Sequence, residues 1–464
     1  MIATSLADIA RVTGGRLAGG ARAAAVVDGP VVIDSRQAAR GALFVALPGE
    51  HVDGHDFAAA AVEAGAVAAL AEREVGAPAI VVADTQAALG LLATDVLGRA
   101  EQCAVVGVTG SSGKTSTKDL LAAVFGAAGP TVAPENSFNN EIGLPLTVLR
   151  VEATTRTLVA EYSARGAGHI ATLCAIARPS IAVVLNVGTA HLGEFGSREA
   201  IATAKGELVE ALPADGVAVL LADDPIVAGM ADRTSARVLS FGRAATADVR
   251  VDDVELDDTG RPRVRLHTPA GPADVRLGVY GAHQALNAAA VVAAALAGGL
   301  DLPAVLAALE AAGPRSPHRM AVQRRPDGLV VIDDAYNANP ESTRAAIDAL
   351  GSIAAGRRRW AVLGEMRELG PEAAELHREV GGHLARSGVE ELVVVGARAP
   401  YADGAGAVPG WRGRARSVGD ATEAARLLHA EADASDVVLV KASNALRLWT
   451  VADALLGAHD EVSA

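Results

Sequence analysis

The sequence predicts an α/β protein of three domains, and three observations support this prediction. Short apolar runs alternate with helical stretches, which is the βαβ pattern of an open parallel sheet. The chain has 464 residues, whereas single cores rarely grow beyond about 250–300 residues. Half of the residues are apolar and 21% are charged, a composition that supplies sizeable cores and argues against disorder.

We expect the first domain at residues 1–100, as a small α/β unit. Its strands are predicted at 31–34, 43–47 and 79–82, where apolar residues cluster. Residues 1–17 lack the basic start and apolar stretch of a secretory signal peptide. We therefore expect a soluble, cytoplasmic protein.

The second domain is expected at residues 101–313, as a parallel sheet. The run at 104–108 predicts a buried strand that leads into a glycine turn. Further strands are expected at 157–161, 181–186 and 217–221. The longest uncharged run, residues 277–300, predicts a buried helix and no membrane insertion, because it contains polar residues and is dominated by weakly apolar alanine.

The third domain is expected at residues 314–464, as a Rossmann-like α/β unit. The proline-containing stretch 314–317 is a candidate linker between the second and third domains. Strands of this last domain are expected at 329–333, 360–364, 392–396 and 437–441.

Charge and cysteine content narrow the possible functions. Lys and Arg number 41 against 55 Asp and Glu, a formal net charge of −14, which disfavours non-specific nucleic-acid binding. The two cysteines, Cys103 and Cys174, have neither disulfide nor metal-ligand spacing. We expect both to be buried thiols.

The strongest local signal is the stretch 109–115, Thr-Gly-Ser-Ser-Gly-Lys-Thr, which follows a predicted strand and opens a helix. Glycines let backbone amides turn toward phosphates, Lys114 would bridge phosphate oxygens and Thr115 would hold magnesium. The longer phosphate-loop pattern has a further glycine where this chain has Val108. A plain glycine turn with a coincidental lysine is the competing interpretation, and the strand–turn–helix context favours the phosphate loop.

Three later residues fall near the same predicted sheet edge. Glu161 ends a buried strand, His191 follows another strand, and Lys205 lies on the next helix. Alone, each has an ordinary structural explanation, such as helix capping or exposure to solvent. Together they favour a site that handles a transferring phosphoryl group, which needs cations and their ligands.

Two further polar stretches, 281–287 and 333–340, stand at the start of an apolar helix and at the end of a strand. The sequence resembles the Mur ligases of peptidoglycan synthesis, which are ATP-dependent amide-forming enzymes. The resemblance rests on these two stretches, the phosphate loop, and the stretches 135–145 and 363–370. Residues 34–36, 43–47 and 53–55 resemble the uridine-nucleotide domain of that family. The resemblance covers essentially the whole chain.

The resemblance implies a role for each matching residue. ATP would be bound by Gly110, Ser111, Ser112, Gly113, Lys114, Thr115, Ser116, His283, Asn287, Arg319, Asp333 and Asn337. Mg²⁺ would be held by Thr115, Glu161, His191 and Lys205, the last as a carbamate. Lys114, His191 and Lys205 would be catalytic, and Ser35, Arg36, Asn139 and Asn140 would contact the other substrates.

Some positions depart from the family pattern. The usual Gly-Glu-Ile is Gly168-His169-Ile170 here, and the usual Lys-Gly-Ser near the C-terminus is Lys441-Ala442-Ser443. These changes leave the magnesium role of Glu161 intact.

The motifs most resemble the family members that join D-alanyl-D-alanine to UDP-N-acetylmuramoyl-tripeptide, and they imply a monomer that uses ATP and Mg²⁺. The alternative member, which adds a diamino acid, carries Asp-Asn-Pro-Arg where this chain has Ala338-Asn339-Pro340-Glu341. Folylpolyglutamate synthases share the ATPase core but lack the uridine-nucleotide domain. A nucleotide-binding regulator that ligates nothing is the alternative from another functional class.

Overall fold

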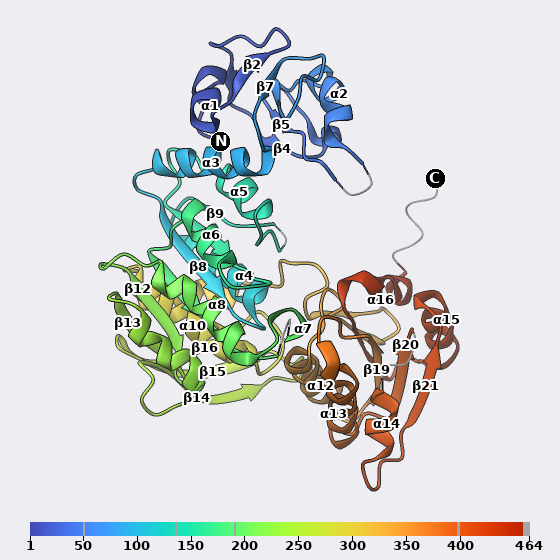
Figure 1. Ribbon diagram of the computed structural model, residues 1–464. Helices are drawn as coiled ribbons and strands as arrows, with labels where there is room; N and C mark the ends of the chain where they lie inside the picture. The colour runs from blue at the N-terminus through green and yellow to red at the C-terminus, as the bar shows by residue number, and fades with distance from the viewer. Residues whose placement is uncertain (50–51, 136, 190–191, 397–399, 458–464) are drawn as a thin grey trace.

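The computed structural model describes residues 1–49, 52–135, 137–189, 192–396 and 400–457. Three open sheets follow one another along the chain, each covered by helices (Figure 1). The prediction of an α/β fold with three sheets is confirmed, and the exact division of the chain at residues 100 and 313 stays a prediction. No helix within the described ranges is long and apolar enough to cross a membrane.

The first sheet has five strands in the order β2-β7-β6-β5-β4, parallel except for β2. The strands are β2 (Arg16–Ala18), β4 (Val31–Val32), β5 (Leu43–Val45), β6 (Ala68–Ala71) and β7 (Ala79–Val81). A small ladder pairs β1 (Thr4–Ser5) with β3 (Val26–Val27). The helices are α1 (Leu6–Thr13), α2 (Ala58–Glu63) and α3 (Thr85–Gly98). One apolar core runs from α1 and α3 into the central sheet, which fixes the first sheet onto the second.

The central sheet has nine strands in the order β16-β15-β14-β13-β12-β11-β8-β10-β9. The strands are β8 (Ala104–Thr109), β9 (Thr131–Val132), β10 (Thr157–Glu161), β11 (Ile181–Val184), β12 (Val217–Leu221), β13 (Arg237–Gly242), β14 (Val249–Leu256), β15 (Pro262–Thr268) and β16 (Gly271–Arg276). The strands pair in parallel up to β14, and β15 and β16 continue as an antiparallel extension. Strands β13 to β16 were not predicted from the sequence.

The central helices include the expected buried one. They are α4 (Lys114–Ala128), α5 (Gly143–Val148), α6 (His169–Ile176), α7 (Leu192–Phe195), α8 (Arg198–Glu210), α9 (Pro225–Ala228), α10 (Gln284–Ala297) and α11 (Leu302–Ala311). Helix α10 is buried along most of its length, which confirms the prediction for this run. Cys174 is buried as predicted, but Cys103 is only partly buried, because it lies in the turn before β8 and not within the sheet.

The last sheet has six strands in the order β17-β18-β22-β19-β20-β21, parallel except for β17. The strands are β17 (Ala321–Arg324), β18 (Val330–Asp333), β19 (Arg358–Gly364), β20 (Glu391–Val395), β21 (Arg414–Val418) and β22 (Asp436–Lys441). The helices are α12 (Pro340–Ala354), α13 (Ala373–Arg386), α14 (Tyr401–Gly406), α15 (Ala421–Glu431) and α16 (Trp449–Leu456). Each face of the sheet has its own apolar core.

Candidate active site

The carboxyl ends of three neighbouring strands meet at the centre of the second sheet. Strand β8 lies between β10 and β11 and is parallel to both. The chain leaves β8 toward β10 and later returns to β11 on the other side, so the loops after these strands frame a crevice, as is usual where an open α/β sheet binds ligands. The crevice brings together the phosphate loop, Glu161 and Asn186.

Asn186 holds the phosphate loop open. Its side-chain oxygen accepts hydrogen bonds from the backbone N–H groups of Ser111 and Ser112, each at 2.9 Å, and its amide donates to the Ser112 carbonyl at 3.1 Å. Gly113, with φ of 81°, precedes helix α4, and a Cβ there would lie 2.8 Å from Oδ1 of Asn287. Asn186 was predicted at a strand end, but this role could not be read from the sequence.

Lys114 begins helix α4, and its Nζ donates to the Gly110 carbonyl at 2.7 Å. Burial lowers the pKa of Lys114, while Glu161 opposes this shift and Arg319 adds to it. Among the described residues, the Gly110 carbonyl is the one hydrogen-bond acceptor of this ammonium. A partly desolvated ammonium is well placed to bind an anion, since phosphate oxygens would restore its lost solvation.

Glu161 is 1% exposed and is held from two sides. Thr115 Oγ1 donates to its Oε2 at 3.1 Å, and Asn139 Nδ2 donates to its Oε1 at 2.8 Å. This hydroxyl and carboxylate suit Mg²⁺, which prefers oxygen ligands and keeps several waters or phosphate oxygens. Consistently, the described residues contain no cluster of three His, Cys, Asp or Glu that could hold a metal by themselves. The predicted ligand His191 lies outside the described residues.

Lys205 lies on α8 and is only 4% exposed. Burial lowers the pKa of its amine well below the ordinary value, and the positive charge of Lys114 lowers it further. The environment therefore favours the neutral amine, which is the form that reacts with carbon dioxide. This fits the predicted carbamate, whose negative charge would face Lys114.

The last domain reaches the phosphate loop directly. Nη2 of Arg319 donates to Thr115 Oγ1 at 3.3 Å, and its guanidinium lies over the Tyr336 ring at 4.3 Å from the centroid. The Nε atom of Arg319 is buried without a hydrogen-bond partner among the described residues. Asn339, the N-cap of α12, donates to the Ser111 carbonyl at 3.3 Å. Two domains thus line one site.

The segment that joins these domains is fixed to the phosphate-loop helix. Lys118 is 1% exposed, and its Nζ contacts Asp119 at 2.5 Å, the Pro134 carbonyl at 3.0 Å and the Ser316 hydroxyl at 3.3 Å. Asp119 accepts from the Ser316 N–H at 3.1 Å. Helix α4 therefore positions the chain that leads to Arg319.

Two cavities border the phosphate loop. One, of about 350 Å³, is lined by Lys114, Thr115, Glu161, Asn337 and the predicted substrate residues Asn139 and Asn140. The other, of about 580 Å³, is lined by His283, Asn287, Leu286 and Phe241 and has the mixed polar and apolar walls that a nucleoside requires. Arg319, Ser112, Gly113 and Ser116 border both cavities.

Asp333 is not among the residues that line these cavities. Its Oδ2 lies 2.6 Å from Nδ1 of His318. Its neighbour Asp334 borders the larger cavity and pairs with Lys441 at 2.6 Å. The sequence predicted a polar stretch at 333–340, but which carboxylate faces the cavity depends on the direction in which strand β18 ends.

The first domain is separate from both cavities. Arg36 is exposed and pairs with Asp34 at 2.6 Å, and neither Ser35 nor Arg36 borders the phosphate loop. A third cavity, of about 530 Å³, lies between the three sheets and is lined by Ile33, Phe138, Asn140, Tyr336 and Trp449. It shares Asn140 and Tyr336 with the 350 Å³ cavity and leads from the first domain toward the phosphate loop.

Known domain families match all three parts of the chain. Residues 30–95 match the Mur ligase family catalytic domain, residues 108–295 the Mur ligase middle domain, and residues 318–444 the Mur ligase glutamate ligase domain.

Curated relatives match over nearly the full length. The UDP-N-acetylmuramoyl-tripeptide--D-alanyl-D-alanine ligase of Mycobacterium tuberculosis is 49% identical, with 98% of each chain covered. The enzyme of that name from Escherichia coli is 35% identical, over 85% of this chain and 86% of the relative.

Solved structures agree. MurF from Acinetobacter baumannii superposes with a TM-score of 0.87 at 31% identity, covering 98% of this chain and 99% of that one. A second structure from that organism, a UDP-N-acetylmuramoylalanyl-D-glutamyl-2,6-diaminopimelate--D-alanyl-D-alanyl ligase, gives a TM-score of 0.85 at 31% identity, with 98% of each chain covered. MurF of Thermotoga maritima in complex with ADP superposes with a TM-score of 0.80 at 32% identity, covering 93% of this chain and 98% of that one.

Proposed function

The chain belongs to the Mur ligase family, and we propose that it joins D-alanyl-D-alanine to the terminal carboxylate of UDP-N-acetylmuramoyl-tripeptide at the expense of ATP. The observation that carries this proposal is the meeting of Lys114 and Glu161 of the central domain with Arg319 of the last domain around one phosphate loop. The reaction belongs to peptidoglycan precursor synthesis. We place it in the cytoplasm and expect a monomer.

The reaction has two steps. The donor carboxylate attacks the γ-phosphorus of ATP, which forms an acyl phosphate and releases ADP. The amine of D-alanyl-D-alanine then attacks the acyl carbon, and the amide forms as phosphate leaves and the amine loses its proton. Lys114 and Arg319 stabilise the charge on the transferring phosphoryl group, and the remaining residues hold the reactants in line.

Magnesium supplies charge neutralisation at the phosphate oxygens when it is bound. Thr115 and Glu161 are the candidate ligands, with His191 predicted from the sequence. We propose that Lys205 joins them as a carbamate: its neutral amine bonds to carbon dioxide and releases one proton. This conversion replaces a neutral amine, whose protonation Lys114 disfavours, with an anion that Lys114 attracts.

The nucleoside is proposed to occupy the 580 Å³ cavity, with adenine beside His283 and Asn287. The donor would run from the first domain, near Ser35 and Arg36, through the 530 Å³ cavity to Asn140. The central domain and the last domain both contribute residues to the ATP site. We therefore expect the last domain to close on ATP before the reaction.

The diamino-acid-adding reaction is the nearest alternative. In that member an arginine follows the Asn-Pro pair, whereas Glu341 stands here and its Oε1 accepts hydrogen bonds from the N–H and hydroxyl of Thr189, each at 3.0 Å. Because Glu341 occupies the position of that arginine, the chain has no cation here to bind the carboxylate of an incoming diamino acid. This difference favours the dipeptide as the acceptor.

Phosphate release with a matrix of UDP-muramoyl peptides and amino acceptors tests the proposal. We expect release only with a tripeptide plus D-alanyl-D-alanine, and a pentapeptide product by mass spectrometry. Release with a dipeptide plus a diamino acid would assign the chain to the preceding reaction. Release without an acceptor would indicate a nucleotide-hydrolysing regulator.

The carbamate has its own test. We expect Lys205→Ala to lower kcat at least about 100-fold, and acetate or formate to restore part of the activity because a small carboxylate fits the vacated space. Wild-type activity should also fall when carbon dioxide is removed from the buffer. Full activity of Lys205→Ala without added carboxylate would contradict this assignment.

A further inference from the structure

The 350 Å³ cavity has a second wall besides the phosphate loop. It is formed by the segment between β10 and α6 and by residues 139–141. Two basic side chains, those of Arg165 and His169, line this wall. Lys114 and Arg319 line the same cavity and serve the phosphate, whereas the reaction described above gives Arg165 and His169 no role.

The guanidinium of Arg165 makes no hydrogen bond or ion pair with any residue in the described part of the chain. Its backbone N–H donates to Nδ1 of His169 at 3.4 Å, which keeps the two residues together. The nearby carboxylates are Glu141, 4.0 Å from the His169 ring, and Glu194, on which both basic residues act electrostatically. The donors of Arg165 therefore remain available to a ligand in the cavity.

The start of helix α6 does not supply an anion site of its own. Glu207 from α8 already accepts the N–H groups of Gly168 at 2.6 Å and Ala171 at 2.9 Å. An anion at this wall must therefore be bound by the side chains of Arg165 and His169. The family pattern has a glutamate in place of His169, so this chain has exchanged an acidic group for a basic one at the mouth of the cavity.

We propose that Arg165 and His169 bind a carboxylate of the donor peptide that does not react. The wall borders the cavity in which the reacting carboxylate must meet the γ-phosphate, so the neighbouring groups of the donor lie within reach of it. A guanidinium is the preferred partner of a carboxylate, because two N–H groups match its two oxygens. This inference rests on the proposed function.

Two donor carboxylates have this chemistry. A tripeptide of alanine, glutamate and diaminopimelate keeps one free carboxylate on the glutamyl residue and a second on diaminopimelate besides the one that reacts. A tripeptide that ends in lysine keeps only the glutamyl one. Comparing these two donors therefore identifies which carboxylate the site binds.

Steady-state kinetics of the full chain with both donors tests the inference. We expect Arg165→Ala to raise the donor KM about 10-fold, equivalent to about 1.4 kcal/mol, with kcat and the KM values for ATP and D-alanyl-D-alanine unchanged. Arg165→Lys should restore part of the affinity. His169→Glu should raise the donor KM by repulsion, and His169→Gln should have a smaller effect. Arg263→Ala, on the solvent-exposed side of β15, is the matched control.

Each result has one meaning. A wild-type preference for the diaminopimelate donor that Arg165→Ala removes would place the third-residue carboxylate at this wall, and an equal loss with both donors would place the glutamyl carboxylate there. An unchanged donor KM, or an equal rise in the KM for ATP, would overturn the inference. Failure of the proposed function is seen separately, as a wild-type enzyme that releases no phosphate with either donor and D-alanyl-D-alanine.

Discussion

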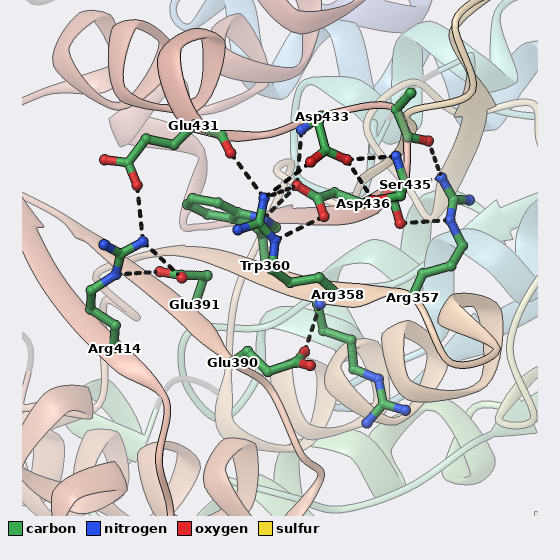
Figure 2. A network of polar contacts seen from close by, with 12 residues as sticks. Arg357, Arg358, Trp360, Glu390, Glu391, Arg414, Glu431, Asp433, Ser435 and Asp436 are labelled. Atoms are coloured by element: carbon green, nitrogen blue, oxygen red, sulfur yellow. Dashed lines mark hydrogen bonds and ion pairs between the residues drawn. The ribbon is translucent and has the colours of Figure 1, made fainter.

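Two charged regions of the molecule differ in how their buried charges are paired. One lies at the carboxyl ends of the strands of the central sheet, and the other at the amino ends of the strands of the last sheet. The phosphate-loop region occupies the carboxyl ends of the central strands, where desolvation lowers the pKa values of the half-buried Lys114 and the buried Lys205. The second region, a charged network, occupies the amino ends of the strands of the last sheet (Figure 2). There, nearly every buried charge has a partner.

Asp436 is the centre of that network. It is fully buried and accepts hydrogen bonds from Arg358 at 2.6 and 2.9 Å and from the Trp360 indole N–H at 3.0 Å. The guanidinium groups of Arg358 and Arg416 lie 5.1 and 5.4 Å from the Trp360 ring centre. Figure 2 shows how Asp436, Arg358 and Trp360, from the amino ends of the neighbouring strands β22 and β19, turn toward one another.

Charges that are paired within the protein stabilise the fold, whereas charges without a full partner are available to bind a ligand. Paired charges at the amino edge offset their own desolvation. Within the described residues, Glu161 offsets only part of the desolvation of Lys114, and no carboxylate offsets that of Lys205. Binding of phosphate to Lys114, and the proposed conversion of Lys205 to a carbamate, would supply the missing charge compensation. Substitutions in the two regions should therefore separate activity from stability.

The largest expected effect on activity is that of Lys114→Ala. We expect kcat to fall at least about 1,000-fold, since a cation aimed at the transferring phosphoryl group is lost. The melting temperature should stay the same or rise, because a desolvated charge is removed. Phosphate release and thermal denaturation measure both quantities, and a kcat within about 10-fold of wild type would contradict the assignment.

Asp436→Asn should show the opposite pattern. We expect it to lower the free energy of unfolding by about 3 kcal/mol, because it leaves Arg358 without its charge partner, and to leave kcat/KM unchanged. Urea denaturation and the phosphate assay measure the two effects. Asp258→Asn, at an exposed turn, is the control, and an equal loss of stability in both variants would refute the role of the network.

The network should also weaken in acid. The hydrogen bond from Arg416 lowers the pKa of Glu431 from its ordinary value of 4.5. A carboxylate whose pKa falls on folding stabilises the fold above the unfolded value and loses that contribution as pH drops through the folded one. The melting-temperature difference between wild type and Arg416→Gln should therefore be full at pH 7 and shrink below about pH 4.5. A constant difference would argue against this ion pair.

The smallest expected effect lies where the two domains meet. Thr189→Val removes one hydrogen bond to Glu341, worth about 1 kcal/mol, and should raise the KM for ATP about fivefold by weakening closure of the last domain. The matched control is Thr203→Val. The Thr203 hydroxyl donates to the Glu199 carbonyl of its own helix, so its loss should leave the KM for ATP unchanged. An unchanged KM in both variants would show that Glu341 does not contribute to closure.

Much of the fold could be predicted because it depends on local pattern. Buried runs such as 157–161 and 217–221 predicted strands β10 and β12, and the glycine–lysine stretch predicted the turn between β8 and α4. The antiparallel extension was missed although β15 alternates buried and exposed residues along its length. That period is the ordinary signal of a half-buried strand, and it could have been found.

By itself, the sequence determined the principal buried strands, the phosphate loop and the placement of Glu161 at a strand end, because each depends on residues close together in the chain. Only the tertiary structure decided that Asn186 holds the loop open, that Asp334 and not Asp333 borders the cavity, and that Arg319 reaches Thr115 across 204 residues. Such contacts depend on how two separately packed sheets face each other. That geometry follows from the summed burial of their surfaces, and no short stretch of residues encodes it.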